Sequence, residues 1–222
     1  YNGMWLVSNF EKMQLPTGWG VEQQITCVDG STFQMYMANM KSIFMDMIKN
    51  TDMVIFNRCK KEDPLPTYRR GIKVANQRAE VIFEDEEGEL GDIFQDEMPF
   101  DMNAPVIEIL PEDYGIWFVD AMDHPENYEG KTVKFKARVM KPRGMGSKFF
   151  VPGRTAMTCC ADDTTFLGYV CKSAYAPKLT PGEWVEVTAK VGIEKRNEYQ
   201  GEEGIVLAAE HVEQCDPLED EM

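Results

Sequence analysis

Basic residues, histidines and long apolar runs are all scarce in this chain. It holds 23 Lys and Arg against 38 Asp and Glu, a net charge of −15, which argues against nucleic acid as a partner because little is left to neutralise phosphates. Only 2 His leave little scope for a Ser-His-Asp triad. No apolar run approaches the ~20 residues of a membrane span, and the first residues lack a signal peptide's basic start and apolar core. We therefore expect a cytoplasmic protein, with no membrane span in this chain.

Cysteine is present, but not in the pattern of a secreted disulfide protein. The 6 cysteines are scattered, which indicates free thiols in a reducing compartment. Cys159 and Cys160 are adjacent, an arrangement too strained for a structural disulfide, and Asp162 follows closely. Two thiols and a carboxylate suit a soft metal or a redox centre. The alternative is that the cysteines are small buried residues of a strand.

Residues 1–85 alternate strand and helix signals. Strands are predicted at 21–29, 53–56 and 79–83, and helices at 33–50 and 68–76, where apolar residues recur at helical spacing. The continuous apolar run at 53–56 is typical of a strand buried on both faces. This β-α-β-α-β order predicts a partial parallel sheet with helices on its faces. Such a sheet leaves an unpaired edge, which favours a homodimer.

Residues 86–104 are predicted to be an acidic linker, and residues 105–216 to be a second domain of a different kind. One short helix is predicted at 113–122, followed by five strands at 132–139, 148–158, 165–172, 184–191 and 204–212 with Gly and Pro turns between them. Five such strands predict a small closed β-barrel of the OB type. Residues 217–222 form an acidic tail. The predicted fold class is thus α/β followed by β.

Three segments of residues 1–85 carry a family resemblance. They are 28–33 (VDGSTF), 50–58 (NTDMVIFNR) and 75–81 (ANQRAEV). They resemble the "VDA-x-x-F", "AD-x-I-x-x-N-K" and "LNP-x-A-x-I" segments of CobW-type GTPases, the G3E class that is linked to metal delivery. The resemblance implies that Asn57 contacts a guanine base and that Arg58 stacks on it. The family's base-reading Asp is replaced by Lys60.

The phosphate-binding part of such a GTPase is missing from this chain. The loop G-x-x-x-x-G-K-[S/T], whose backbone amides hold the phosphates, does not occur. The family's Cys-x-Cys-Cys metal motif does not occur either. We therefore expect no GTP hydrolysis from this chain alone, and GTP binding only in a longer protein with the loop upstream of Tyr1.

A second resemblance spans about residues 105–215. Its segments are 127–133 (NYEGKTV), 153–163 (GRTAMTCCADD) and 182–187 (GEWVEV). They are similar to the C-terminal domain of YcgQ-like proteins, small partners encoded beside a membrane permease. That family shows "R-x-x-M-x-CC-x-AD", and the chain follows this order from Arg154 to Asp162 without the second spacer. The resemblance makes the cysteine pair a functional candidate.

The cysteine pair alone does not complete a zinc site, because Zn(II) takes four ligands. Asp162 is the nearest further donor, and more distant candidates are Asp163, Cys171, His211 and Cys215. Arg154 has two interpretations: it pairs with an acid such as Asp162, or it lowers the pKa of a neighbouring thiol.

These features predict a metal-homeostasis factor or metallochaperone that depends on GTP, with Zn(II) held by Cys159, Cys160 and Asp162. Its partners would be a metal-client protein or a membrane permease. The alternative is a non-catalytic module that docks on a permease, with structural cysteines. A thiol redox function is a third hypothesis.

Overall fold

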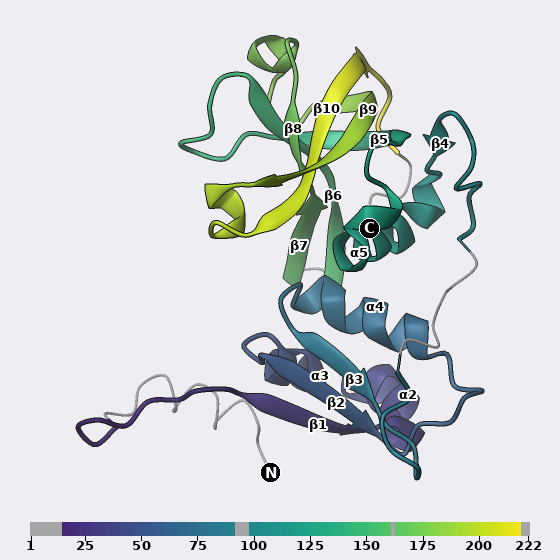
Figure 1. Cartoon of the computed structure of the whole chain (residues 1–222), viewed down its shortest axis with the longest axis vertical. Helices are drawn as coiled ribbons and strands as arrows, with labels where there is room; N and C mark the ends of the chain where they lie inside the picture. Colours follow the sequence, from purple (N-terminus) through teal and green to yellow (C-terminus); the bar gives the residue numbers. More distant parts are fainter. Residues whose placement is uncertain (1–14, 92–97, 161–162, 219–222) are drawn as a thin grey trace. The chain divides into compact units, whose positions relative to one another are not determined.

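The computed structural model describes residues 15–91, 98–160 and 163–218, without the side chains of residues 159 and 160. The chain divides into two compact units, residues 1–96 with 157–165 and residues 97–156 with 166–222. The first is built on a parallel sheet with helices and the second is a β-barrel (Figure 1). The predicted fold class is confirmed, whereas the domain limits set at 85, 104 and 216 stay predictions.

The first unit, called the α/β unit below, contains three parallel strands in the order β1-β2-β3. Its elements are β1 (Ile25–Asp29), α2 (Gly30–Asn39), α3 (Lys41–Ile48), β2 (Met53–Asn57), α4 (Leu65–Ala75) and β3 (Glu80–Phe83). The single helix predicted at 33–50 is wrong, because Met40 leaves the helical region with φ −138° and separates α2 from α3. The apolar spacing continues across this break and conceals it.

The core of the α/β unit lies on one face of the sheet. Val54 and Phe56 are fully buried there, and the Phe56 ring packs against Phe33 of α2, Tyr68 of α4 and Phe83. All three helices contribute to this one cluster of buried residues. Residues of the opposite face, such as Ile25 and Ile55, keep part of their surface exposed. The prediction that residues 53–56 are buried on both faces is therefore wrong.

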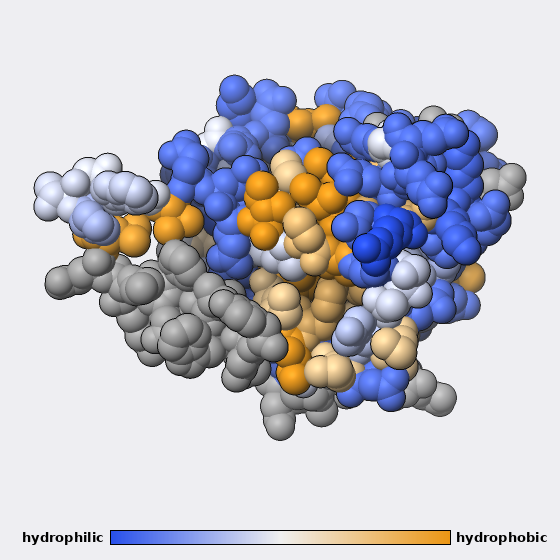
Figure 2. All heavy atoms as spheres, turned by 90° about the horizontal axis from the view of Figure 1, so that it is seen from below, coloured by the Kyte–Doolittle hydropathy of each residue, from blue (hydrophilic) through white to orange (hydrophobic). Residues whose placement is uncertain are grey.

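Large apolar side chains remain exposed on the α/β unit. On the face seen from below, apolar residues gather in a patch (Figure 2). The exposed large apolar residues of this unit include Trp19, Val21, Ile25, Met35, Met40 and Ile43. A large exposed apolar patch marks an interaction site or an association hazard.

Asn76, in the third segment of the CobW-type resemblance, has a structural role. Its amide nitrogen donates to the carbonyl oxygens of Ile48 (2.8 Å) and Thr51 (2.7 Å). These carbonyls lie at the end of α3 and just before β2, where backbone acceptors lack a helical partner. Asn76 therefore ties the end of α4 to the α3–β2 connection.

The second unit, called the barrel unit, has seven strands among the described residues, and five of them form a closed ring. Its strands are β4 (Ile107–Glu108), β5 (Thr132–Met140), β6 (Phe149–Cys160), β7 (Asp163–Gly168), β8 (Val170–Lys172), β9 (Trp184–Lys195) and β10 (Glu203–Gln214). The sheet order is β4-β5-β9-β10-β8-β6-β7, and an additional β5–β6 pairing closes the ring. The β8–β10 pair is parallel, whereas β5, β6 and β9 pair antiparallel within the ring. The predicted strand at 165–172 is wrong in one respect, since Tyr169 separates β7 from β8.

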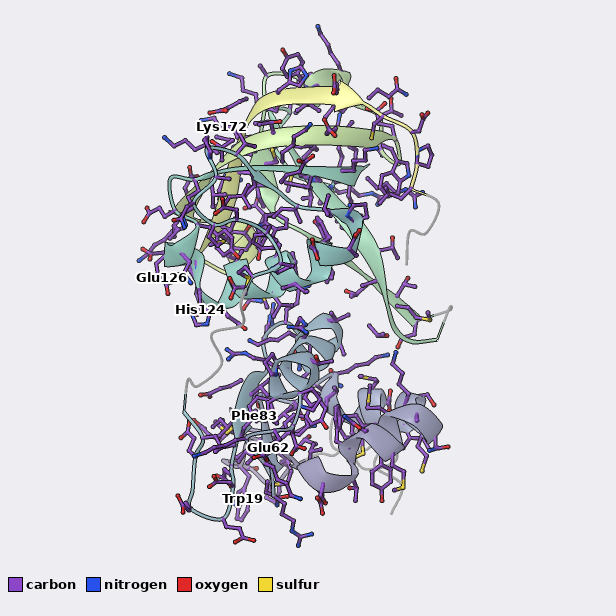
Figure 3. The ribbon with its side chains drawn as sticks, turned by 90° about the vertical axis from the view of Figure 1, so that its right-hand side faces the viewer. Trp19, Glu62, Phe83, His124, Glu126 and Lys172 are labelled. Atoms are coloured by element: carbon purple, nitrogen blue, oxygen red, sulfur yellow. The ribbon has the colours of Figure 1, made fainter. Side chains whose placement is uncertain are left out.

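Helix α5 (Tyr114–Asp123) supplies an aromatic layer to the barrel core. Trp117 is 1% exposed and its ring packs against Tyr114, Phe135 and Tyr169. The Tyr169 hydroxyl donates to the Phe118 carbonyl at 2.5 Å. These contacts fix the helix against β5 and the β7–β8 junction. His124 ends the helix and lies 3.7 Å from Glu126 (Figure 3).

Two glycines allow a close backbone crossing within the barrel. A Cβ at Gly153 would lie 2.3 Å from the Leu167 carbonyl oxygen, and one at Gly168 would lie 2.7 Å from the Pro152 carbonyl oxygen. No side chain fits at either place without moving the backbone. Gly153 begins one of the segments that carry the YcgQ-like resemblance, and the role of both glycines here is to permit this crossing.

The helices of the described ranges are all too short or too polar to cross a bilayer.

Candidate functional site

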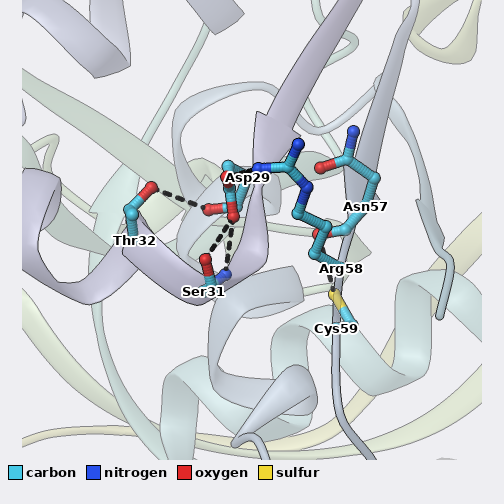
Figure 4. Close-up of polar contacts among 6 residues, drawn as sticks. All are labelled: Asp29, Ser31, Thr32, Asn57, Arg58 and Cys59. Carbon is cyan, nitrogen blue, oxygen red and sulfur yellow. Dashed lines mark hydrogen bonds and ion pairs between the residues drawn. The ribbon is translucent and has the colours of Figure 1, made fainter. Parts of the chain in front are cut away.

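Residues from two of the segments that resemble CobW-type GTPases meet at the carboxyl ends of β1 and β2. Asp29 ends β1 and forms the N-cap of α2, where its carboxylate accepts hydrogen bonds from the Ser31 amide (3.0 Å) and hydroxyl (2.6 Å) (Figure 4). Asn57 ends β2 in the register position beside Asp29. In open parallel sheets, ligands bind at this end of the strands.

Arg58 is held by Asp29. Its Nη1 lies 2.7 Å from the Asp29 carboxylate, while 73% of its side chain stays exposed (Figure 4). Its φ of +55° is rare for a residue other than glycine. The hydrogen bond from the Ser31 hydroxyl is the main cause that keeps the pKa of Asp29 below its ordinary value, and Arg58 lowers that pKa further. This ion pair was not predicted, because its members are 29 residues apart in the sequence. The N-cap role of Asp29 does have a sequence signal, since Asp before Gly-Ser-Thr is typical of a helix start.

Asn57 presents an exposed carboxamide that bonds no described residue. Next along the loop, the Asp63 carboxylate accepts the Lys60 amide at 2.7 Å and so stabilises the turn. The structure thus brings Asn57 and Arg58 to the same sheet edge. Their contact with a guanine base stays a prediction.

Cys59 packs beneath this sheet edge, in the core of the α/β unit. It is buried, and a Cβ added at Gly30 would lie 2.7 Å from its sulfur. Burial, together with the charge of Asp63, raises the pKa of its thiol to about 11. A protonated thiol is a poor nucleophile and metal ligand, so the role of Cys59 is to pack between α2 and the β2 end.

The cysteine pair lies at the end of a β-hairpin. β6 ends at Cys160 and β7 begins at Asp163, so two residues join the strands. The Thr158 hydroxyl bonds the carbonyl (2.8 Å) and the carboxylate (2.5 Å) of Asp163 across this turn. The side chains of Cys159 and Cys160, and all of Asp162, lie outside the described residues. The metal site predicted from them stays a prediction.

The more distant donors do not form a cluster with one another. Cys171 is fully buried in β8, and burial raises the pKa of its thiol to about 12. His211 is exposed on β10, 3.4 Å from Glu213, and Cys215 follows the end of that strand. Among the described residues, no three His, Cys, Asp or Glu side chains are placed to hold a metal ion.

Arg154 has a structural role in the barrel. It is only 7% exposed, donates to the carbonyls of Lys136 (3.0 Å) and Pro111 (2.7 Å), and lies over the Tyr114 ring at 4.6 Å. It therefore fastens the segment before α5 to β5 and β6. The hydrogen bonds of Arg154 that the structure describes go to backbone carbonyls. One of the two interpretations from the sequence had paired it with a carboxylate such as Asp162.

The family comparison covers the barrel. A model of the DUF1980 C-terminal domain matches residues 89–220, more than half of the chain. The chain belongs to the DUF1980 C-terminal domain family. This membership fits the permease-associated C-terminal domain that the second resemblance implied. The match leaves out the three-stranded sheet, so the CobW-type resemblance of that sheet stays a prediction.

Other comparisons add little to the DUF1980 assignment. No curated protein matches the chain. A mitochondrial single-stranded DNA-binding protein from S. cerevisiae is similar over 39% of this chain and 95% of its own, at 10% identity and a TM-score of 0.24. An aspartyl-tRNA synthetase from Entamoeba histolytica is similar over 53% of this chain and 27% of its own, at 14% identity and a TM-score of 0.28. TM-scores this low carry no argument about this chain.

Proposed function

We propose that this DUF1980-family chain takes part in metal homeostasis, with the β6–β7 hairpin end as an exchange site for Zn(II). Cys159 and Cys160 would supply thiolates, and Asp162 a carboxylate oxygen. The observation that supports this is the place of the Cys-Cys-x-Asp motif: its two cysteines are the last residues of β6, beside the point where Thr158 and Asp163 join β6 to β7. The three ligands lie within four consecutive residues, so their backbones are close together without any long-range folding.

The chemistry of such a site suits transfer rather than permanent structure. Structural zinc sites have four protein ligands, and the Cys-Cys-x-Asp motif offers three. A metal-client protein or a permease would then supply the fourth ligand during exchange. Because thiols lose their protons on binding, uptake would release protons and weaken as the pH falls.

Zinc competition against a chromophoric chelator tests this proposal with reduced protein. We expect stoichiometric binding that the double variant Cys159→Ser/Cys160→Ser abolishes and that Asp162→Asn weakens. Cys27→Ser is the matched control, because it removes an exposed thiol from β1 and should leave binding unchanged. Absence of binding, or equal loss in the control, would refute the site and favour a permease-docking module with structural cysteines.

We also propose that the α/β unit contacts a guanine base through Asn57 and Arg58 in a longer GTP-binding protein. The exposed carboxamide of Asn57 at the carboxyl end of the central strand supports this. Amide NMR spectra during titration with guanosine monophosphate test it. We expect shifts at residues 57–60 that Asn57→Ala removes, whereas Asn39→Ala, an exposed asparagine at the end of α2, should leave them. Unchanged shifts in Asn57→Ala would refute the contact.

A further inference from the structure

A pocket lies between two loops of the barrel unit. Its volume is about 590 Å³, and it separates the loop that joins β5 to β6 from the loop that joins β9 to β10. It is lined by Pro142, Arg143, Gly144, Met145, Gly146, Phe149, Lys195, Arg196, Asn197 and Glu198. Pockets of this size hold small organic ligands. None of the residues predicted for zinc or guanine lines it.

The charge around this pocket is opposite to that of the whole chain. Residues 130–161 contain eight Lys and Arg and no Asp or Glu, in a chain of net charge −15. This range comprises β5, the β5–β6 loop and β6. Positive charge is thus concentrated in one part of an acidic protein, and one wall of the pocket belongs to it.

Two cations at the pocket are available to an anion. Arg143 is exposed and bonds no described residue. Lys195 is 71% exposed, and its contact with Glu203 is long, at 3.9 Å. An exposed ion pair of that length contributes little. Both side chains are therefore able to turn towards a bound phosphate or carboxylate at small cost.

A third cation forms a rigid planar wall. The Arg196 guanidinium lies over the Phe149 ring, 4.3 Å from its centroid. Arg196 donates hydrogen bonds to both oxygens of the Glu198 carboxylate, at 2.9 and 3.2 Å. The Arg196 side chain is only 16% exposed. A guanidinium fixed in this way is a stacking surface for a planar ring. The pocket therefore combines two exposed cations with a planar group that is held in place.

We infer that this pocket binds a small phosphate-bearing ligand with a planar ring, of the mononucleotide class. Arg143 and Lys195 bind the phosphate, and the Arg196–Phe149 stack receives the ring. A small ligand fits better than a polynucleotide, because the negative field of the whole chain repels a long polyanion while a single phosphate meets only the local cations. This site lies outside both parts of the proposed function.

Titration of the full chain with AMP, followed by amide NMR, tests the inference. We expect shifts confined to residues 142–149 and 194–198. Arg143→Glu/Lys195→Glu should weaken AMP binding by about tenfold or more. The control Lys178→Glu/Lys190→Glu makes the same charge change at exposed lysines outside the pocket, and should change affinity by no more than about twofold.

A further comparison, between AMP and inorganic phosphate, distinguishes stacking of the ring from binding of the phosphate. Phe149→Leu should weaken AMP binding but leave the weaker binding of inorganic phosphate unchanged. Absence of shifts in the two loops, shifts at residues 57–60 alone, or equal weakening by the control pair would overturn the inference. Tighter binding of a short thymidine oligonucleotide than of AMP at these loops would overturn the assignment to a small ligand.

Discussion

The two units of this protein bury their cores in different ways. The barrel closes on itself through the β5–β6 pairing, so each strand of the ring has a partner on both sides. Among the described residues, the sheet of the α/β unit has three strands, and β1 and β3 each pair with β2 alone. Closure removes the exposed strand edges that invite association, whereas an open sheet retains them. The barrel is thus self-contained, and the open sheet keeps surface for a partner.

Among the cysteines whose side chains the structure describes, each unit contains one that is buried, and its reactivity can report whether that unit has opened. Cys59 is in the α/β core, and Cys171 is in the barrel. Burial raises the pKa of the first thiol to about 11 and of the second to about 12. Both should resist alkylation until their own unit opens.

The largest effect is expected from Phe56→Ala, which removes the ring at the centre of the α/β aromatic cluster. The cavity should cost about 3–5 kcal/mol of unfolding free energy. Alkylation by iodoacetamide, followed by mass spectrometry, should become faster at Cys59 and stay unchanged at Cys171. Phe150→Ala, at a fully buried barrel position, should give the reverse pattern. Equal acceleration at both thiols would show that the two units open together.

A smaller effect is expected from Ile25→Lys. Ile25 is 48% exposed on β1, which pairs on one side only within the part of the chain that the structure describes. Unfolding free energy should change by no more than about 0.5 kcal/mol, but binding of an apolar dye should fall. If the predicted homodimer forms through this edge, sedimentation velocity should show a shift towards monomer. Val106→Lys, an exposed apolar residue of the barrel unit, should leave both measurements unchanged.

The smallest effect concerns the pKa of Asp29, which its contacts lower. Because the pKa is lower in the folded state, these contacts stabilise the fold above the ordinary carboxyl pKa, about 3.9, and this stabilisation is lost as pH falls through the folded pKa. Carboxyl NMR titration should show a raised pKa in Ser31→Ala and a smaller rise in Arg58→Ala, since Ser31 is the larger cause. A larger rise in Arg58→Ala would contradict this order.

The barrel strands were predictable because their residues alternate. In β5 and β9, buried and more exposed positions follow each other over many residues, and this pattern is visible in the sequence. The break at Tyr169 was not, since the tyrosine itself suits a strand. In the α/β unit, apolar residues at Met53 and Ile55 suggested two buried faces, but whether helices cover both faces depends on the chain's three-dimensional path.

The candidate sites were predictable only as segments. The sequence indicated Asn57, Arg58 and the Cys159–Cys160 pair, but not the Asp29–Arg58 contact, whose members are 29 residues apart. The pocket beside Arg143 was missed for a related reason. Its two loops lie about fifty residues apart in the sequence, and only the β5–β9 and β9–β10 pairings bring them together. Net charge, an average over the chain, also concealed the local positive segment.

The position of β10 has a consequence for how the chain folds as it is made. This strand comes last among those of the barrel, yet it lies between β9 and β8 in the sheet. When the nascent chain has emerged only as far as Lys195, the edges of β8 and β9 that β10 will later join are still unpaired. Translation of the residues up to Gln214 takes about 1–4 s at common elongation rates. During that interval the edges of β8 and β9 that β10 later covers are unpaired, and unpaired edges invite association with other strands.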